Sequence, residues 1–310
     1  MTNIETFQQA LPHGITLSCR AAGTRGRPVL MFLHGFPEAA FVWDELLKHF
    51  SQPENGGYRC IAPNLRGFEK SSSPTEVSAY RVKFLMQDIA ALIAIETADS
   101  GDKLACLVAH DWGGAVAWSI ANYMPHVAEK LAIINSPHTG TFIRELSRNP
   151  KQQAASAYMN FLVRPDSEQI LAEDDFRRLF AFFTNMGAET GEFAWLTPAV
   201  KEQYREVWRA GLTGGCNYYR ASPLRPPTET DKGAAALDIP HHLLTVDIPT
   251  LVIWAMNDIA LPPELIDGLD AYIPDLTIKK VDNGTHWVIH EQPQLIAGYL
   301  QNFLLQGFPR

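Results

Sequence analysis

The chain has 310 residues, of which 46% are hydrophobic and 19% are charged, a composition typical of globular proteins with a sizeable core, in one large or two smaller α/β domains. Its net charge of −8, without a lysine- or arginine-rich run, argues against a nucleic-acid partner. It has no bilayer-spanning apolar stretch, no signal-peptide pattern in Met1–Pro12 and no CxxC pair, so we expect a cytoplasmic, disulfide-free protein without membrane contact.

Strand and helix patterns alternate along the chain. Short apolar runs predict strands at Pro28–Leu33, Arg59–Ala62, Leu104–Ala109, Leu131–Ile134, Thr250–Trp254 and Leu276–Val281. Helical patterns separate most of them, at Ala79–Thr97, Ala115–Tyr123, Pro263–Tyr272 and, closing the chain, Pro293–Leu305. This alternation predicts an α/β fold, with a mostly parallel sheet and helices on both of its faces.

The alternation fails once, between about His138 and Asp238. That stretch carries helical patterns at Asp174–Phe183 and Pro198–Gly211, and no convincing strand. A helical insertion above the carboxyl ends of the strands would act as a lid. We therefore predict a core in two parts, residues 1–137 and 239–310, with an inserted helical cap at residues 138–238.

The strongest chemical signal follows the Leu104–Ala109 run, where Asp111 precedes Gly113 and Gly114. A strand that turns sharply into a helix between small residues is a nucleophile elbow, which points one side chain into a pocket. A carboxylate there attacks an alkyl carbon and leaves an alkyl ester, which favours an epoxide or an organohalide as substrate. The alternative is that Asp111 only caps the following helix.

The loop after the Pro28–Leu33 strand reads His34-Gly35-Phe36-Pro37-Glu38. Its glycine allows the backbone to approach a ligand closely. The Phe36 N–H and the Trp112 N–H are candidates for an oxyanion hole, in which removal of one donor costs about 10²–10³ in rate in known cases. For His34 we favour a structural role, with its ring bonded to the loop backbone.

Two further loops supply an acid and a histidine. Asp258 follows the Thr250–Trp254 run and suits a residue that orients a histidine, although it could equally be a turn aspartate. His286 follows the last strand, so the chain order is nucleophile, acid and histidine. His290 makes a His-x-x-x-His pair with His286, but without a third ligand at a suitable spacing we expect no metal.

On these motifs the chain resembles the epoxide hydrolase branch of the α/β-hydrolase superfamily over essentially its whole length. His34-Gly35-Phe36-Pro37 matches the HGxP oxyanion motif, whose proline is often cis in that family. Residues 110–114 match the nucleophile elbow, with Ala109 in place of the usual glycine. Asn64-Leu65-Arg66-Gly67-Phe68 with Ser71 is similar to the D-x-R-G-x-G-x-S loop, and residues 135–138 resemble the segment that launches the cap.

The resemblance extends to two tyrosines of the predicted cap. Asn217-Tyr218-Tyr219-Arg220 looks like the N-W-Y-R motif, whose tyrosine maps to Tyr219. Tyr158, seven residues before Pro165, matches the position of the partner tyrosine in a different local context. The resemblance implies that both hydroxyls donate hydrogen bonds, and then a proton, to an epoxide oxygen. Packing inside the cap is the alternative role for both.

The predicted reaction is the hydrolysis of an apolar or aryl epoxide to a vicinal diol in two steps. Asp111 attacks the epoxide, and His286, oriented by Asp258, activates the water that cleaves the ester. Aromatic walls for this small-molecule substrate would come from Phe36, Trp112 and Trp287. No cofactor is required, and the sequence leaves the oligomeric state open between a monomer and a homodimer.

A dehalogenase that uses the same aspartate on a haloalkane or a haloacid is the alternative. Haloalkane dehalogenases resemble this elbow, Trp112 included, but many carry an asparagine as second halide donor where Phe36 stands. Haloacetate dehalogenases carry arginines one and four residues after the nucleophile, and those positions are Trp112 and Ala115 here. A binding protein on the same fold is a third class, which would show no turnover.

Overall fold

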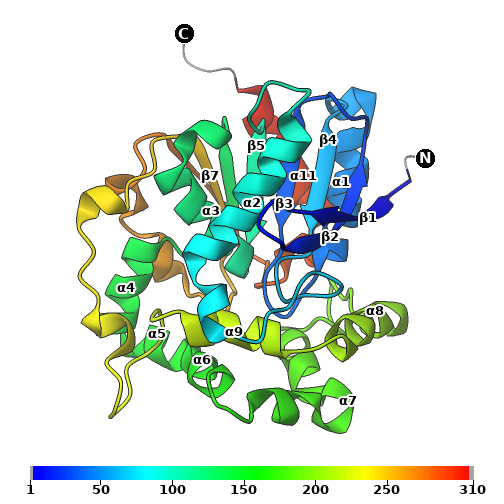
Figure 1. Cartoon of the computed structure of the whole chain (residues 1–310). Coiled ribbons are helices and arrows are strands. Elements are labelled where there is room, and N and C mark those ends of the chain that lie inside the picture. Colours follow the sequence, from blue (N-terminus) through cyan, green and yellow to red (C-terminus); the bar gives the residue numbers. More distant parts are fainter. Residues whose placement is uncertain (1–2, 307–310) are drawn as a thin grey trace.

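The computed structural model describes residues 3–306 and contains one eight-stranded sheet, in the order β1-β2-β4-β3-β5-β6-β7-β8 (Figure 1). The β1–β2 and β2–β4 pairs are antiparallel, and every other pair is parallel. The strands are β1 (Glu5–Ala10), β2 (Thr16–Ala22), β3 (Val29–Leu33), β4 (Arg59–Pro63), β5 (Cys106–His110), β6 (Leu131–Ile134), β7 (Thr250–Ala255) and β8 (Leu276–Val281). The predicted mostly parallel sheet is confirmed.

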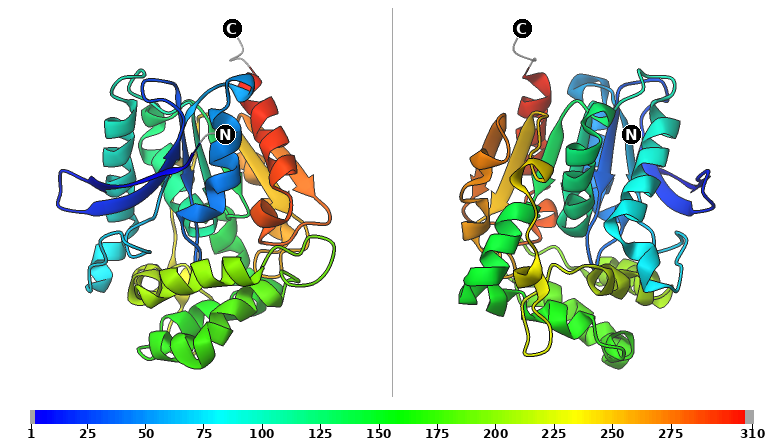
Figure 2. Two further views of the ribbon diagram at one scale, coloured as in Figure 1. Left: turned by 90° about the vertical axis from the view of Figure 1, so that its right-hand side faces the viewer. Right: turned by 60° about the vertical axis from the view of Figure 1, so that its left-hand side comes forward.

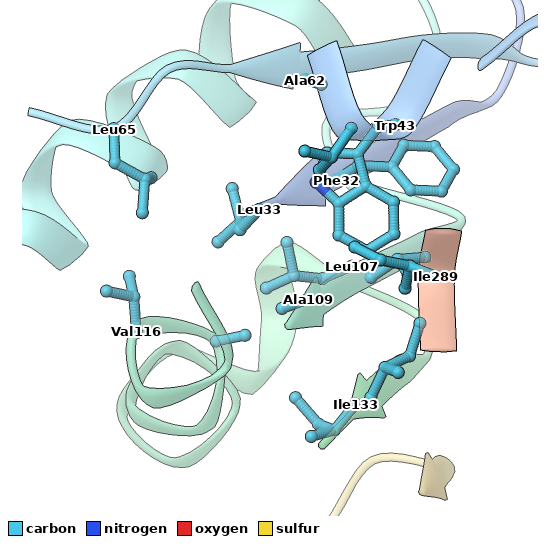
Figure 3. Packing of buried hydrophobic residues seen from close by; sticks show 14 of the residues in the cluster. Phe32, Leu33, Trp43, Ala62, Leu65, Leu107, Ala109, Val116, Ile133 and Ile289 are labelled. Carbon is cyan, nitrogen blue, oxygen red and sulfur yellow. The ribbon is translucent and has the colours of Figure 1, made fainter. Parts of the chain in front are cut away.

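The core lies around the central strands, where every residue of β3, β5, β6 and β7 is buried. A parallel strand covered on both faces needs apolar side chains on both sides, which explains why these strands read as continuous apolar runs. Trp43 packs beside Phe32 of β3, with ring centroids 5.5 Å apart (Figure 3). Side chains of β5 and β6 continue this packing through Leu107, Ala109 and Ile133.

Helices cover both faces of the sheet, as predicted. The helices α1 (Asp44–Ser51) and α11 (Pro293–Leu305) lie on one face, and α2 (Val82–Thr97) and α3 (Asp111–Tyr123) lie on the other (Figure 2). Among residues 3–306 no helix has the length and apolar character that crossing a membrane requires. All four cysteines are buried and free.

The structure contains several helices that were not predicted, among them α1, and it differs from the sequence-based prediction most clearly in two features. The β1–β2 hairpin was not predicted, because β1 is largely solvent-exposed at the sheet edge and carries little apolar signal. The helix predicted at Pro263–Tyr272 is wrong, since the segment forms two short 3₁₀ turns instead. The break has a local cause: Asp267 is extended and Gly268 adopts a left-handed backbone with φ of +77°.

Residues 139–249, which we call the inserted segment, connect β6 to β7 and contain no strand. The segment lies at one end of the sheet, in green and yellow in Figures 1 and 2. It covers the carboxyl ends of the strands, because Trp208 Nε1–H donates to the Pro37 carbonyl after β3 and Tyr218 O–H donates to the Arg66 carbonyl after β4. Its helices are α4 (Thr139–Arg148), α5 (Pro150–Ala155), α6 (Ala157–Leu162), α7 (Ser167–Thr184), α8 (Pro198–Arg209) and α9 (Thr213–Ala221).

Candidate active site

The elbow between β5 and α3 has Asp111 at its apex, in a left-handed backbone with φ of +48°. Two glycines make this sharp turn possible. A Cβ added to Gly113 would lie 2.4 Å from the Leu33 carbonyl oxygen, and one added to Gly114 would lie 2.3 Å from the Ser136 Cβ. Because neither space admits a side chain, α3 packs directly against its neighbours and holds Asp111 at the sheet edge.

The loop after β3 reaches the Asp111 carboxylate. The Phe36 N–H donates to Asp111 Oδ1 at 2.7 Å, and a Cβ on Gly35 would lie 2.3 Å from the Asp111 Cβ. The Phe36–Pro37 peptide is cis, as the resemblance implied. The N-cap residue of α3 is His110 and Asp111 is the first residue of the helix, and the Asp111 carboxylate accepts the Phe36 N–H of the β3 loop, which argues against the helix-capping alternative.

A histidine and a second carboxylate lie on the other side of Asp111. His286 Nε2 is 3.9 Å from Asp111 Oδ2, and His286 Nδ1–H donates to Asp258 Oδ2 at 2.7 Å. The other Asp258 oxygen accepts the N–H groups of Ala260 and Leu261, each at 2.9 Å. Asp258 therefore combines the two roles weighed from the sequence, since one oxygen shapes its turn and the other orients the histidine.

Electrostatics favour an ion pair between His286 and Asp258. Burial alone lowers the pKa of His286, but the carboxylates of Asp258, Asp111 and Glu38 raise it to about 9. Burial raises the pKa of Asp258, whereas His286 and the donors around it lower it below its usual value. One of these donors is Asn135, whose Nδ2–H lies 2.8 Å from Asp258 Oδ2.

Tyr158 of α6 and Tyr219 of α9 line two cavities together with Asp111. The larger cavity, of about 320 Å³, extends from Asp111 along His286, and the smaller, of about 50 Å³, extends along Trp112. Among the described residues, only Asp111 and the two tyrosines line both cavities. The structure thus brings the predicted nucleophile and both predicted tyrosines to the point where the cavities meet.

Both tyrosine hydroxyls are protonated over a wide pH range. Burial raises the pKa of Tyr158 and of Tyr219 well above the usual value, and the Asp111 carboxylate raises both further. The Tyr219 ring is held by edge-on contacts with Phe36 at 5.3 Å and Trp112 at 5.1 Å between centroids. Two buried, protonated phenols therefore line the same cavities as the Asp111 carboxylate.

The aromatic residues that were predicted to line the substrate pocket are distributed over the two cavities. Phe36 and Trp287 line the larger one, and Trp112 lines the smaller one. Trp287 is only 2% exposed, and its Nε1–H donates to the Phe182 carbonyl at 3.0 Å. It therefore contributes to the wall mainly as a packed, fixed side chain.

The two remaining histidines of the motifs have structural partners. His34 Nε2 accepts the Leu65 N–H, and its Nδ1–H donates to the Gly35 carbonyl, which confirms the structural role predicted for it. His290 contacts Glu38 Oε1 at 2.7 Å through Nε2 and stacks on Trp195 at 3.9 Å. Among residues 3–306 no group of three or more His, Cys, Asp or Glu side chains is arranged to hold a metal ion.

Sequence reasoning missed a buried acid beneath the site. Glu38 is fully buried and contacts His110 Nδ1 at 3.2 Å, His290 Nε2 at 2.7 Å and the Tyr204 O–H at 3.0 Å. Burial raises the pKa of Glu38, but its histidine partners lower it well below the usual value. His110 Nε2–H in turn donates to the His286 carbonyl at 2.9 Å. The only sequence signal was an acid next to the HGxP motif.

The family model and the similar proteins indicate the same family for this chain. Residues 28–293 match the family model of the alpha/beta hydrolase fold. The AB hydrolase superfamily protein YfhM of Bacillus subtilis is 34% identical over 94% of this chain and 96% of its own length. Mouse epoxide hydrolase 4 is 31% identical over 94% of this chain and 77% of its own length.

Solved structures of epoxide hydrolases superpose over nearly the whole chain. One from metagenomes of hot environments is 36% identical, with a TM-score of 0.85 over 98% of this chain and 100% of the other. The Bacillus megaterium epoxide hydrolase, solved with an inhibitor, is 28% identical, with a TM-score of 0.86 over 97% of this chain and 100% of the other. This chain is therefore a hydrolase that belongs to the alpha/beta hydrolase fold family, in its epoxide hydrolase branch.

Proposed function

We propose that this protein is an epoxide hydrolase that opens an apolar or aryl epoxide to a vicinal diol through a covalent ester on Asp111. One observation carries the proposal: two protonated tyrosines line the same cavities as a carboxylate at a nucleophile elbow, with a histidine–aspartate pair on its other side. The epoxide hydrolase activity named for similar proteins supports it.

In the first step Asp111 Oδ2 attacks a ring carbon, and the carbon–oxygen bond of the epoxide breaks. Oδ1 is already held by the Phe36 N–H and becomes the ester carbonyl. The opening ring develops alkoxide charge, which Tyr158 and Tyr219 stabilise by donating hydrogen bonds and then a proton. A neutral phenol is the form needed, and burial keeps both tyrosines in that form.

The second step is attack of water on the carboxyl carbon of Asp111. Formation of the ester removes the Asp111 charge, which is one of the charges that raise the His286 pKa. The imidazole then loses its proton more readily and takes one from water, while Asp258 stabilises the imidazolium that forms. The oxyanion lies between the N–H groups of Phe36 and Trp112. Its collapse breaks the bond between the carboxyl carbon and the substrate oxygen, which takes the imidazolium proton and leaves as the diol. The proton then left on the Asp111 carboxyl group returns to the tyrosine that was deprotonated in the first step. The first step thereby prepares the base for the second.

The cavity linings support an uncharged, apolar substrate. Aromatic and aliphatic side chains dominate both walls, and no lysine or arginine occurs among the described residues that line them. The larger cavity suits an aryl or branched alkyl substituent. We further propose that residues 138–238 act as a cap that carries both tyrosines over the two core parts, 1–137 and 239–310.

A dehalogenase receives less support. A second side-chain donor to the halide would be needed at position 36, but this position carries a phenylalanine, whose ring packs on Tyr219. A departing halide also needs no proton, so it gives no reason for two buried tyrosines.

The tyrosines provide the test that separates the two chemistries. Tyr219→Phe is expected to lower the rate of Asp111 alkylation by an epoxide by about 10²–10⁴-fold, less where Tyr158 compensates. The double replacement by phenylalanine is expected to nearly abolish alkylation while the fold is kept. Single-turnover kinetics with styrene oxide measure this rate. Unchanged epoxide turnover in the double variant, or halide release from a haloalkane without epoxide activity in the wild type, would overturn the proposal.

A further inference from the structure

Helix α9, which carries Tyr219, is seated on the core by a contact between two glycines. A Cβ on Gly214 would lie 2.3 Å from both the Cα and the carbonyl oxygen of Gly67, in the loop after β4. The atoms that block it are backbone atoms, which cannot rotate away as a side chain does. The first turn of α9 therefore rests directly on this loop, and any side chain at position 214 would lift the helix.

A hydrogen bond next to Tyr219 fixes the same helix in a second place. The Tyr218 O–H donates to the Arg66 carbonyl at 2.9 Å, and Tyr218 is only 1% exposed. Arg66 is itself fixed, because its guanidinium pairs with Asp88 at 2.6 and 2.7 Å. The acceptor therefore belongs to a well-anchored loop.

The two contacts together determine where the next side chain points. Successive residues of an α-helix differ by about 100° around its axis. With the Tyr218 hydroxyl bonded to the Arg66 carbonyl, the Tyr219 side chain points to a different side of the helix, where it contacts Phe36 and Trp112 and lines the cavities. The glycine contact sets the height of α9, and the Tyr218 bond sets its rotation.

We propose that Tyr218 is a positioning residue for the reaction: its bond to the Arg66 carbonyl, together with the seat of Gly214 on Gly67, holds the Tyr219 hydroxyl over Asp111. This inference rests on the proposed function, because it assigns Tyr219 to the opening of the epoxide. It predicts an effect on the first chemical step only. Hydrolysis of the ester depends on His286 and the N–H groups of the core, which α9 does not supply.

The test uses two substitutions with matched controls. Tyr218→Phe removes only the hydroxyl, and Thr97→Val is its control, since the buried Thr97 hydroxyl at the end of α2 donates to the Ile93 carbonyl at 2.8 Å. Gly214→Ala displaces the helix, and Gly298→Ala is its control, because a Cβ at this position of α11 meets nothing within 4 Å. Single-turnover reactions with styrene oxide give separate rate constants for alkylation of Asp111 and for hydrolysis of the ester.

Displacement of a reacting group by about 1 Å can cost about 100-fold in rate, so we expect Tyr218→Phe and Gly214→Ala to slow alkylation by about 10- to 100-fold. Ester hydrolysis in both, and both steps in the two controls, stay within about twofold of the wild type by the same reasoning. Equal losses in both steps, wild-type alkylation in either folded variant, or the same loss in Thr97→Val would overturn the inference. Absence of epoxide turnover in the wild type would instead refute the proposed function.

Discussion

Replacement of Asp258 by asparagine tests whether Asp258 and His286 act mainly in the hydrolysis of the ester, with Asp111 acting in its formation. The change keeps the shape of the side chain but removes the charge 2.7 Å from His286 Nδ1. That charge is the largest of those that raise the His286 pKa to about 9, whereas burial lowers it. We therefore expect the pKa of His286 in Asp258→Asn to fall from about 9 toward its ordinary value of 6.5.

The size of the effect follows from this shift. A fall of at least two pKa units removes about 3 kcal/mol of imidazolium stabilisation, at about 1.36 kcal/mol per unit. Because the imidazolium forms as water attacks the ester, this loss corresponds to a decrease in hydrolysis rate of about 10²-fold. Alkylation changes little, since Asp111 keeps its bond to the Phe36 N–H.

The two rates are separable by rapid quenching of enzyme mixed with styrene oxide, followed by mass measurement of the peptide that contains Asp111. The ester is expected to accumulate in Asp258→Asn and to remain scarce in the wild type. Asp282→Asn is the matched control, since this exposed aspartate lies in the same loop after β8 as His286. Wild-type hydrolysis in Asp258→Asn would refute the assignment of Asp258 as the orienting acid, and equal loss of both steps would refute its role mainly in ester hydrolysis.

Three further outcomes follow from the same geometry. Folding raises the His286 pKa from 6.5 to about 9, so the contribution of this residue to stability is complete below about pH 6.5 and is lost as the pH rises through about 9. The melting temperature of the wild type is therefore expected to fall more steeply between about pH 7 and 9 than that of His286→Gln. Parallel melting curves of the two proteins would contradict the pKa shift. Asn135→Ala removes a donor to Asp258, which costs about 1–3 kcal/mol in urea unfolding; an unchanged free energy of unfolding would show that this bond is not needed. Gly35→Ala places a Cβ 2.3 Å from the Asp111 Cβ, so labelling of Asp111 by epoxide is expected to disappear, and labelling at the wild-type rate would contradict the close approach of this loop.

The sequence predicted the parts of the fold that have strong local patterns. Most of the buried parallel strands are continuous apolar runs, and the observed bounds of one of them, β6, equal the predicted ones. The bounds of the less buried edge strand β8 also equal the predicted ones. The β1–β2 hairpin lacks this pattern because β1 is exposed at the sheet edge. The failed helix at Pro263–Tyr272 shows that helical periodicity does not reveal a single left-handed glycine, here Gly268.

The candidate site likewise has residues that the sequence predicted and contacts that it did not. Asp111, Asp258 and His286 each follow a recognisable strand, so their meeting at one sheet edge could be predicted from the chain order. The contacts of Glu38 could not, because His110 and His290 lie 72 and 252 residues away. Nothing in the local sequence indicates a pair so widely separated.

The seat of α9 belongs with the contacts that only the structure reveals. Nothing in the sequence predicts that Gly67 and Gly214 are in contact, because the contact depends on the close approach of two backbone segments. The Tyr218 bond to Arg66 likewise joins residues 152 positions apart. Such contacts determine where the recognisable motifs point.

The covalent ester on Asp111 is the central claim, and a single turnover in water labelled with heavy oxygen tests it most directly. With enzyme in excess over styrene oxide, water attacks the Asp111 carboxyl carbon, so we expect the label to enter the Asp111 carboxylate and the diol to remain unlabelled. Mass spectrometry of the Asp111 peptide and of the diol reads both outcomes. Label in the diol and none in Asp111 would mean direct attack of water on the epoxide and would contradict the covalent mechanism.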